Sequence, residues 1–400
     1  MSDQKQGHLP TLVACFLHFD LSFMLWVLIG ALGILIADDL QLSAGQRGVL
    51  VALPILSGSL LRIPLGLLSD RWGARRVGGT MLAFLFLPLM VGWLGAGSWP
   101  VMMAVGLMLG TAGASFAVAL PLASAWYPPQ RQGLVMGIAA AGNSGTVITN
   151  LLAPRLAAEV GWHGVFGIAM VPLAVVLATF LMLAREAPPR PRAARPFREV
   201  LREADLWWFC LFYSVTFGGY VGLSSFLPLF LRDQQGLAAS SAGMLTAAAA
   251  FVGSGARPIG GWLADRIGGR RLLTLALAGL GVTYALVASG PSLPPLTGLV
   301  IVAMACCGLG NGAVFQLVPL RFRAEIGMVT GLIGAVGGIG GFCLPLLLGL
   351  VRQFGGGFGP GFLLLAAAAT TVAAVLQILT ARQAGWRLSW QSGAQVSESA

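Results

Sequence analysis

The chain has 400 residues, a mean hydropathy of +0.84 and only 10% charged residues, which excludes a soluble globular domain. The net charge of +10 does not indicate nucleic-acid binding, because nearly all of the basic residues lie in loops between apolar segments. No Walker loop, zinc-ligand spacing, nucleophile motif or carboxylate pair lies in those segments. We therefore predict no enzyme, no metal and no cofactor.

Apolar runs of about 20 residues, each long enough to cross roughly 30 Å of hydrocarbon, follow one another along the chain. These runs predict an all-α integral membrane protein with about twelve transmembrane helices, in a lipid bilayer and as a monomer. The twelve runs lie near 11–36, 48–68, 77–97, 100–125, 133–157, 163–184, 206–231, 241–263, 272–290, 294–319, 328–351 and 359–380.

Basic residues are distributed unequally between the two sets of loops. With the N-terminus inside, 18 Lys and Arg residues face the cytoplasm and 4 face outward. This bias predicts a cell (inner) membrane protein with both termini in the cytoplasm. Arg62 and Arg257 are the two cations that belong to no loop.

The chain divides into two similar parts. A proline- and arginine-rich cytoplasmic linker, 185–205, separates an N-terminal six-helix half, 1–184, from a C-terminal six-helix half, 206–380. A shift of 195 residues places Arg62 on Arg257 and gives eight identities in the fifteen positions that begin there. We predict two parallel repeats. A polar cytoplasmic tail, 381–400, is predicted to be disordered, with Trp386 and Trp390 at the membrane interface.

An arginine within a membrane span needs a compensating partner. It costs several kcal/mol unless it snorkels, pairs or faces water. Equivalent repeat positions face each other across the central pathway, so Arg62 and Arg257 should repel each other. Of the fourteen acidic residues only Asp20 lies in a predicted span. A bound anion is the simplest counter-charge, with snorkelling or an Asp20 pair as the alternatives.

Residue types near the two arginines suggest which anion binds. A guanidinium matches a planar oxyanion bidentately. Phe116 and Phe315 occupy nearly equivalent points of the fourth and tenth spans, and Asn143 offers an amide donor in a glycine-rich stretch. Packing is the alternative role for each. The pattern favours a planar monoanion.

Two loops resemble a known signature. "GLLSDRWGARR" and "GWLADRIGGRR", between the second and third span of each half, resemble the loop motif of the major facilitator superfamily. The resemblance implies the two-half major facilitator fold. It also implies that Asp70, Arg71, Asp265 and Arg266 lock helix ends together in one state of the transport cycle, with topology anchoring as the alternative.

The glycine-rich segments narrow the resemblance. "GLVMGIAAAGNSGTVITN" and "GMVTGLIGAVGGIGGFCLP", with the paired arginines and the first and seventh spans, resemble the nitrate/nitrite porters of that superfamily. The resemblance implies an anion clamp at Arg62 and Arg257 and a phenylalanine sandwich at Phe116 and Phe315. It implies supporting contacts at Asn143, Tyr213 and Phe217. The first signature has alanines for glycines and the second lacks the asparagine, which leaves the preference between nitrate and nitrite open.

The expected function is nitrate and nitrite transport by alternating access, with the two halves rocking about a midplane anion. The protein would be a nitrate/nitrite exchanger, or a nitrate:proton symporter in which Asp20 carries the proton. The nearest rival is a porter for another small anion such as formate, oxalate or a monocarboxylate. A membrane sensor without transport is a rival of a different class, and the intact arginine pair argues against it.

Overall fold

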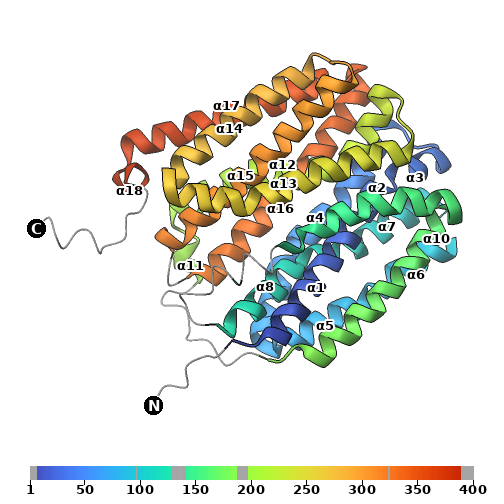
Figure 1. The fold of residues 1–400 in the computed structure, drawn as a ribbon, viewed down its shortest axis with the longest axis horizontal. Coiled ribbons are helices and arrows are strands. Elements are labelled where there is room, and N and C mark those ends of the chain that lie inside the picture. Colours follow the sequence, from blue (N-terminus) through green and yellow to red (C-terminus); the bar gives the residue numbers. More distant parts are fainter. Residues whose placement is uncertain are drawn as a thin grey trace, which may run out of the picture.

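The structure is a computed structural model that describes residues 7–95, 97–127, 135, 141–186, 197–322 and 325–388. All of the regular secondary structure in these residues is helical (Figure 1). The N-terminal half contains α1 (Leu9–Trp26), α2 (Leu28–Ala31), α3 (Gly33–Asp39), α4 (Ala44–Trp72), α5 (Ala74–Phe84), α6 (Phe86–Gly95), α7 (Trp99–Leu109), η1 (Gly110–Ala114), α8 (Ser115–Ala125), η2 (Ala141–Ser144) and α10 (Gly145–Leu183).

The C-terminal half follows the linker, of which residues 187–196 lie outside the described ranges. Apart from the two short helices α11 and α18, its helices are long, and fewer of them are interrupted than in the N-terminal half. They are α11 (Phe197–Val200), α12 (Ala204–Gln235), α13 (Ala239–Ile267), α14 (Gly269–Ala288), α15 (Leu293–Arg321), α16 (Ile326–Gly355), α17 (Gly359–Arg382) and α18 (Ala384–Arg387).

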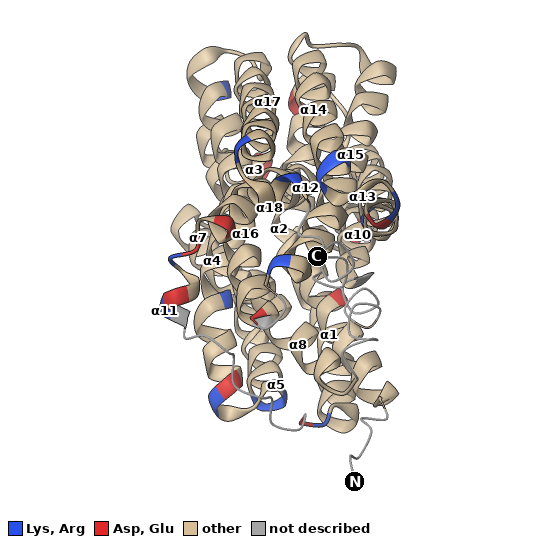
Figure 2. Cartoon of the chain, turned by 90° about the vertical axis from the view of Figure 1, so that its left-hand side faces the viewer, with Lys and Arg blue, Asp and Glu red and all other residues tan. Residues whose placement is uncertain are grey.

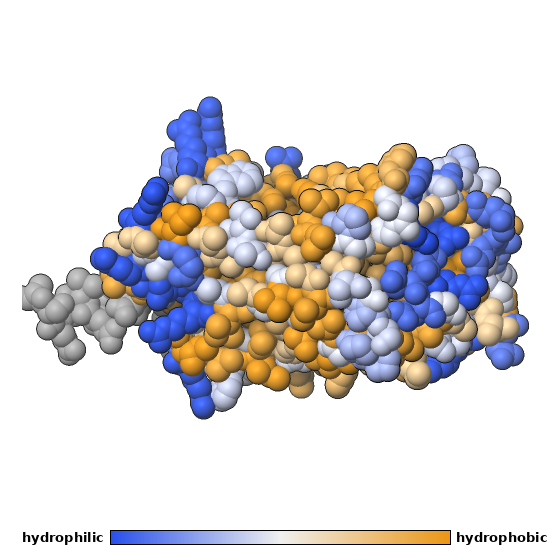
Figure 3. Space-filling view, turned by 90° about the horizontal axis from the view of Figure 1, so that it is seen from above, coloured by the Kyte–Doolittle hydropathy of each residue, from blue (hydrophilic) through white to orange (hydrophobic). Residues whose placement is uncertain are grey.

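Within the described ranges, ten helical segments are long and apolar enough to cross a membrane. Two differences account for the gap to the twelve predicted runs. The fifth and sixth runs merge in α10, which continues through a break at Gly161, where φ is 72°. The other difference is that α13 is not among the ten segments. It has the length of a span but is rich in alanine, glycine and serine and carries Arg257. An apolar belt with hydrophilic ends is visible on the surface (Figure 3).

The sequence repeat is also a repeat of local geometry. α4 and α13 are both 29 residues long, and each ends at a glycine, Gly73 or Gly268. These glycines have φ values of 93° and 91°, which a residue with a Cβ rarely adopts. The same turn therefore leads into the next helix of each half.

We call the end that carries the start of α1 and α18 the inner end, and the opposite end the outer end (Figure 1). Seen from the inner end, the two halves lie one above the other, with charged residues at helix ends and in loops (Figure 2). α16 of the C-terminal half packs along both α12 and α4, so it forms much of the contact between the halves.

Contact between α4 and α16 decreases toward the inner end. A Cβ built on Gly349 would lie 2.7 Å from the Cα of Gly48, and one on Gly341 would lie 3.2 Å from Cγ2 of Ile55. A Cβ on Gly331, nearer the inner end, would meet nothing within 4 Å among the described atoms. The halves are in close contact from the outer end to the level of Gly334, and beyond that level Gly331 faces open space.

Polar contacts also join the halves at the outer end. Nη1 of Arg47 on α4 lies 2.8 Å from Oδ1 of Asp233 on α12. The backbone N–H of Gly45 donates to Oε1 of Gln353 on α16 at 2.8 Å. These bonds add to the glycine contacts that close the outer end.

The start of the tail differs from the prediction. Residues 389–400 lie outside the described ranges, so Trp390 is not placed, but α18 is a short ordered helix. Trp386 is 1% exposed rather than at the membrane interface, so that prediction was wrong. Its indole packs on the rings of Phe209 and Phe212, and its Nε1–H donates to Oδ1 of Asp205 at 3.0 Å. Burial of this large apolar ring holds the start of the tail against α12.

Candidate functional site

Arg62 lies in the middle of α4 and is only 1% exposed. Its Nε–H donates to the carbonyl oxygen of Gly113 in η1 at 3.0 Å, and its Nη1 donates to the carbonyl oxygen of Gly334 in α16. Gly113 belongs to the N-terminal half and Gly334 to the C-terminal half, so one guanidinium bridges both. Nη2 is buried and has no hydrogen-bond partner among the described residues.

Aromatic rings surround the Arg62 guanidinium. Its Cζ lies 5.3 Å from the ring centroid of Trp26, 5.1 Å from that of Phe116 and 5.3 Å from that of Phe217. Trp26 is fixed because its Nε1–H donates to the carbonyl oxygen of Pro54 at 2.8 Å. Cation–π attraction offsets part of the cost of burying this charge. The sequence analysis did not identify Trp26, since an apolar residue in an apolar run carries no distinguishing signal.

Arg257, the repeat partner of Arg62, is half-buried on α13. Its Nη2 donates to the hydroxyl of Tyr213 on α12 at 3.4 Å, and its Cζ lies 5.6 Å from the ring of Phe315 on α15. Its Nη1 is buried without a partner in the described part of the chain. Phe217 beside Arg62 stacks on Tyr213 beside Arg257, so the two predicted clamp residues lie on one aromatic cluster.

Aromatic contacts connect the two arginines. Tyr213 stacks on Phe217 with centroids 4.8 Å apart, and Phe315 meets Tyr213 edge-on at 5.0 Å. Phe116 and Phe315, from opposite halves, have centroids 6.4 Å apart with their planes at 45°. The structure thus brings together both predicted arginines and four predicted aromatic residues. Their binding of an anion stays a prediction.

Asn143 and Asp20 lie apart from this cluster. Asn143 is buried in η2, which packs on α1, and its Oδ1 has no hydrogen-bond partner among the described residues. Asp20 on α1 accepts a hydrogen bond from the Ser144 hydroxyl at 2.7 Å. No described contact joins Asn143 or Asp20 to either arginine, and no ion pair in the described ranges includes Asp20.

The four predicted gating residues, Asp70, Arg71, Asp265 and Arg266, are exposed at the inner ends of α4 and α13. None forms an ion pair within the described ranges. Arg266 instead lies over the ring of Trp262, with its Cζ 3.9 Å from the centroid. Their role as a lock between helix ends stays a prediction.

The family model described as Major Facilitator Superfamily matches residues 14–345. The chain is 37% identical over 346 residues to the nitrite extrusion protein of Bacillus subtilis, covering 86% of this chain and 87% of that protein. It is 35% identical over 374 residues to the probable nitrate/nitrite transporter NarK2 of Mycobacterium tuberculosis, covering 90% and 94%. This chain belongs to the nitrate/nitrite porters of the Major Facilitator Superfamily.

Solved structures agree with the fold of this porter. It superposes on the nucleoside transporter NupG with a TM-score of 0.71 at 15% identity, covering 92% of this chain and 99% of that chain. On a bacterial homologue of the human lysosomal transporter Spinster the TM-score is 0.68 at 20% identity, with 98% of each chain covered. At such identities the likeness shows the fold alone. The predicted multi-pass, two-half fold of the porter is confirmed.

Proposed function

We propose that the protein moves nitrate and nitrite across the cell membrane by alternating access, as an exchanger. The observation that carries this proposal is that Arg62 and Arg257, from opposite halves, lie on one cluster of contacting aromatic rings. Each arginine retains a buried N–H group without a partner among the described residues. Two nearby cations without a carboxylate bonded to either favour an anion between them, because an anion removes their repulsion and completes their hydrogen bonds.

Shape supports a small, planar anion. The ring centroids of Phe116 and Phe315 lie 6.4 Å apart. Two rings that sandwich a flat group at ordinary contact distances have centroids about 7 to 8 Å apart. An entering anion therefore has to separate these rings by about 1 Å. Trigonal nitrate and bent nitrite meet this requirement, and both match the fork of a guanidinium.

The direction of opening follows from the proposed orientation. With the basic loops inside the cell, the inner end is the cytoplasmic end. Contacts at Gly48, Gly349 and the Arg47–Asp233 pair close the outer end, while Gly331 faces open space. The described conformation is then one in which the site communicates with the cytoplasm. The opposite conformation requires these outer contacts to break and the inner helix ends to meet.

Exchange follows from the charge of the empty site. Bringing the inner ends of the two halves together without an anion places two guanidiniums in a poorly hydrated space, where their repulsion is strong. A bound monoanion cancels much of that repulsion, so the loaded site closes more readily than the empty one. The protein would then return to its first conformation only with a second anion bound.

Asp20 provides the route to the alternative, proton symport. Its carboxylate accepts a hydrogen bond from Ser144 and lies beside η2, which is part of the first glycine-rich signature. A deprotonated Asp20 carboxylate could offset part of the arginine charge in place of a second anion, and it would take up a proton when nitrate binds. Because neither the Ser144 bond nor the distance from the arginines requires a proton, we favour a structural role in holding η2 against α1.

The test is nitrate uptake into liposomes that contain purified protein. Uptake is measured with nitrite inside, and with an empty lumen under an inward proton gradient, for wild type and Asp20→Asn. We expect uptake to require internal nitrite and to persist in the variant. Uptake driven by the proton gradient alone and lost in Asp20→Asn would establish symport instead. Excess formate should compete weakly; complete competition would favour an organic-anion porter.

A further inference from the structure

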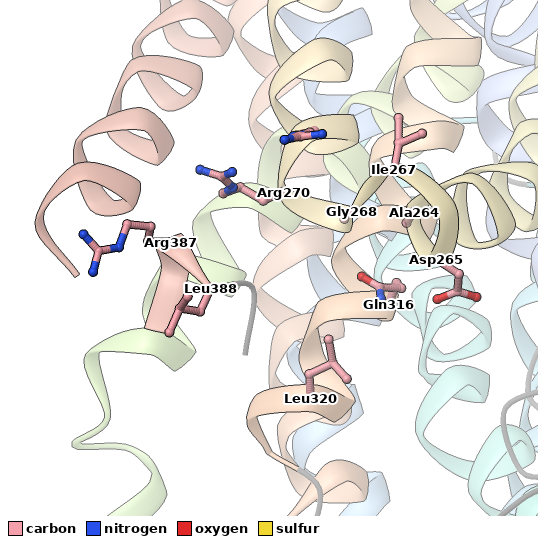
Figure 4. A pocket seen from close by; sticks show the side chains of 11 residues that line it. Ala264, Asp265, Ile267, Gly268, Arg270, Gln316, Leu320, Arg387 and Leu388 are labelled. Carbon is pink, nitrogen blue, oxygen red and sulfur yellow. The ribbon is translucent and has the colours of Figure 1, made fainter. Parts of the chain in front are cut away.

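A second cationic cavity lies at the inner end of the C-terminal half, away from the site between the halves. It has a volume of about 380 Å³. It lies where α13 and α15 end and α14 begins, beside the end of α18. Figure 4 shows Arg270 of α14 and Arg387 of α18 on one side, with Gln316 and Leu320 of α15 below them. Asp265 lies on the side away from Arg387.

The charge around this cavity is unbalanced. Three arginines, Arg270, Arg271 and Arg387, line it against the single carboxylate of Asp265. None of these four forms an ion pair within the described part of the chain, and Nε of Arg270 is buried with no partner there. Nearby Arg321 shows the contrasting arrangement, because it bonds Glu203 at 2.9 Å and Asp205 at 2.7 Å. The cavity therefore holds excess positive charge.

The position of Arg387 is fixed by its neighbour in sequence. Trp386 is buried against Phe209 and Phe212, and its indole N–H bonds Asp205. The short helix α18 thus holds an exposed guanidinium at the edge of the cavity at little entropic cost. A surface arginine on a free tail would lose far more side-chain and backbone freedom when it bound a ligand.

The rim of the cavity is apolar. Ile267, Leu320 and Leu388 line it and are exposed, at the end of the molecule where the apolar belt gives way to hydrophilic residues (Figure 3). Arginines beside exposed aliphatic side chains match a phosphate that is attached to a glycerol and acyl chains. We infer that this cavity binds a phosphate oxyanion, and an anionic phospholipid headgroup fits it better than free phosphate. This inference does not depend on which anion the porter carries.

The experiment measures lipid binding to the full-length, delipidated protein in detergent by native mass spectrometry. The probes are dioleoyl phosphatidylglycerol, dioleoyl phosphatidylcholine and inorganic phosphate, with wild type, Arg387→Gln and the Arg270→Gln/Arg387→Gln double variant. We expect phosphatidylglycerol to bind in preference to phosphatidylcholine. Loss of one arginine should weaken its binding roughly fivefold, and loss of two should weaken it more.

Arg382→Gln is the matched control, because Arg382 is exposed on the last turn of α17 and does not line the cavity. It should bind phosphatidylglycerol as wild type does. Equal losses in Arg382→Gln and Arg387→Gln would overturn the inference in favour of general surface charge, as would unchanged binding in the double variant. Saturable, Arg387-dependent binding of inorganic phosphate with no lipid preference would support the phosphate site and make free phosphate its ligand.

Discussion

Arg62 and Arg257 occupy equivalent positions in two repeats whose helices have the same length and the same terminal turn, yet they are held differently. Arg62 is buried and donates to carbonyl groups of both halves. Arg257 is half-buried and has one long hydrogen bond, to Tyr213 of its own half. The repeat therefore fixes the position of each arginine along its helix. The packing around that helix in this conformation decides what each guanidinium contacts. In this state Arg257 is the arginine more free to reach an arriving anion.

The largest effect should come from replacing each arginine by lysine, which keeps the charge and loses the planar fork. Arg62→Lys should reduce nitrate/nitrite exchange about 100-fold, since a charged, buried hydrogen bond contributes about 1.5 to 3 kcal/mol. Arg257→Lys should reduce it about tenfold, because the planar fork toward the anion is lost while no buried carbonyl bond is broken. Rates are compared in liposomes at equal protein content. Equal losses would remove the difference between the two positions, and full activity in either variant would contradict the clamp.

A smaller effect should follow from crowding the Arg62 side of the site. A Cβ on Gly334 would lie 3.1 Å from both Nη1 of Arg62 and Cε1 of Phe116, so Gly334→Ala should displace the guanidinium. We expect nitrate affinity to fall about tenfold, in line with about 1 to 3 kcal/mol for overpacking. Calorimetric titration of the purified protein measures this change.

Gly331→Ala is the matched control on the same helix, because a Cβ there meets no described atom within 4 Å. Its nitrate affinity should equal that of wild type. If the two alanine variants bind nitrate equally well, close packing on Arg62 has no part in binding.

The smallest effect should come from Tyr213→Phe, which frees Arg257 from its hydroxyl partner at 3.4 Å. We expect a two- to threefold change in nitrate affinity, since such a weak bond contributes about 0.5 kcal/mol. Tyr220→Phe is the control, because that hydroxyl bonds Ser254. A loss as large as that of Arg257→Lys would show that Tyr213 itself contacts the anion.

Much of the architecture could be predicted from sequence because it depends on local signals. Apolar length predicted the spans, and the 195-residue repeat paired Arg62 with Arg257. The orientation predicted from the excess of arginine in alternate loops stays a prediction. These signals need no knowledge of packing. α13 lies at their limit, because its alanine, glycine and serine content and Arg257 leave it outside the ten described segments that are apolar enough to cross a membrane.

Contacts that depend on packing could not be predicted. The carbonyl groups of Gly113 and Gly334 are present in any sequence, and only the fold selects them as partners of Arg62. Trp26 and Trp386 resemble many other apolar residues until neighbouring helices surround them. The unequal burial of the two arginines depends on how the neighbouring helices pack around α4 and α13, which a sequence alone does not specify.

The bond from Arg62 to the Gly334 carbonyl has a consequence for the release of substrate. A peptide carbonyl carries a partial negative charge, so the Gly334 carbonyl is a weak mimic of an anion, supplied by the opposite half. If nitrate takes both guanidinium nitrogens of Arg62, it displaces this built-in competitor, and the carbonyl returns when nitrate leaves. Competition of this kind lowers affinity most in the conformation where the two halves meet at Gly334, and it assists unloading there without any change in the charge of the site.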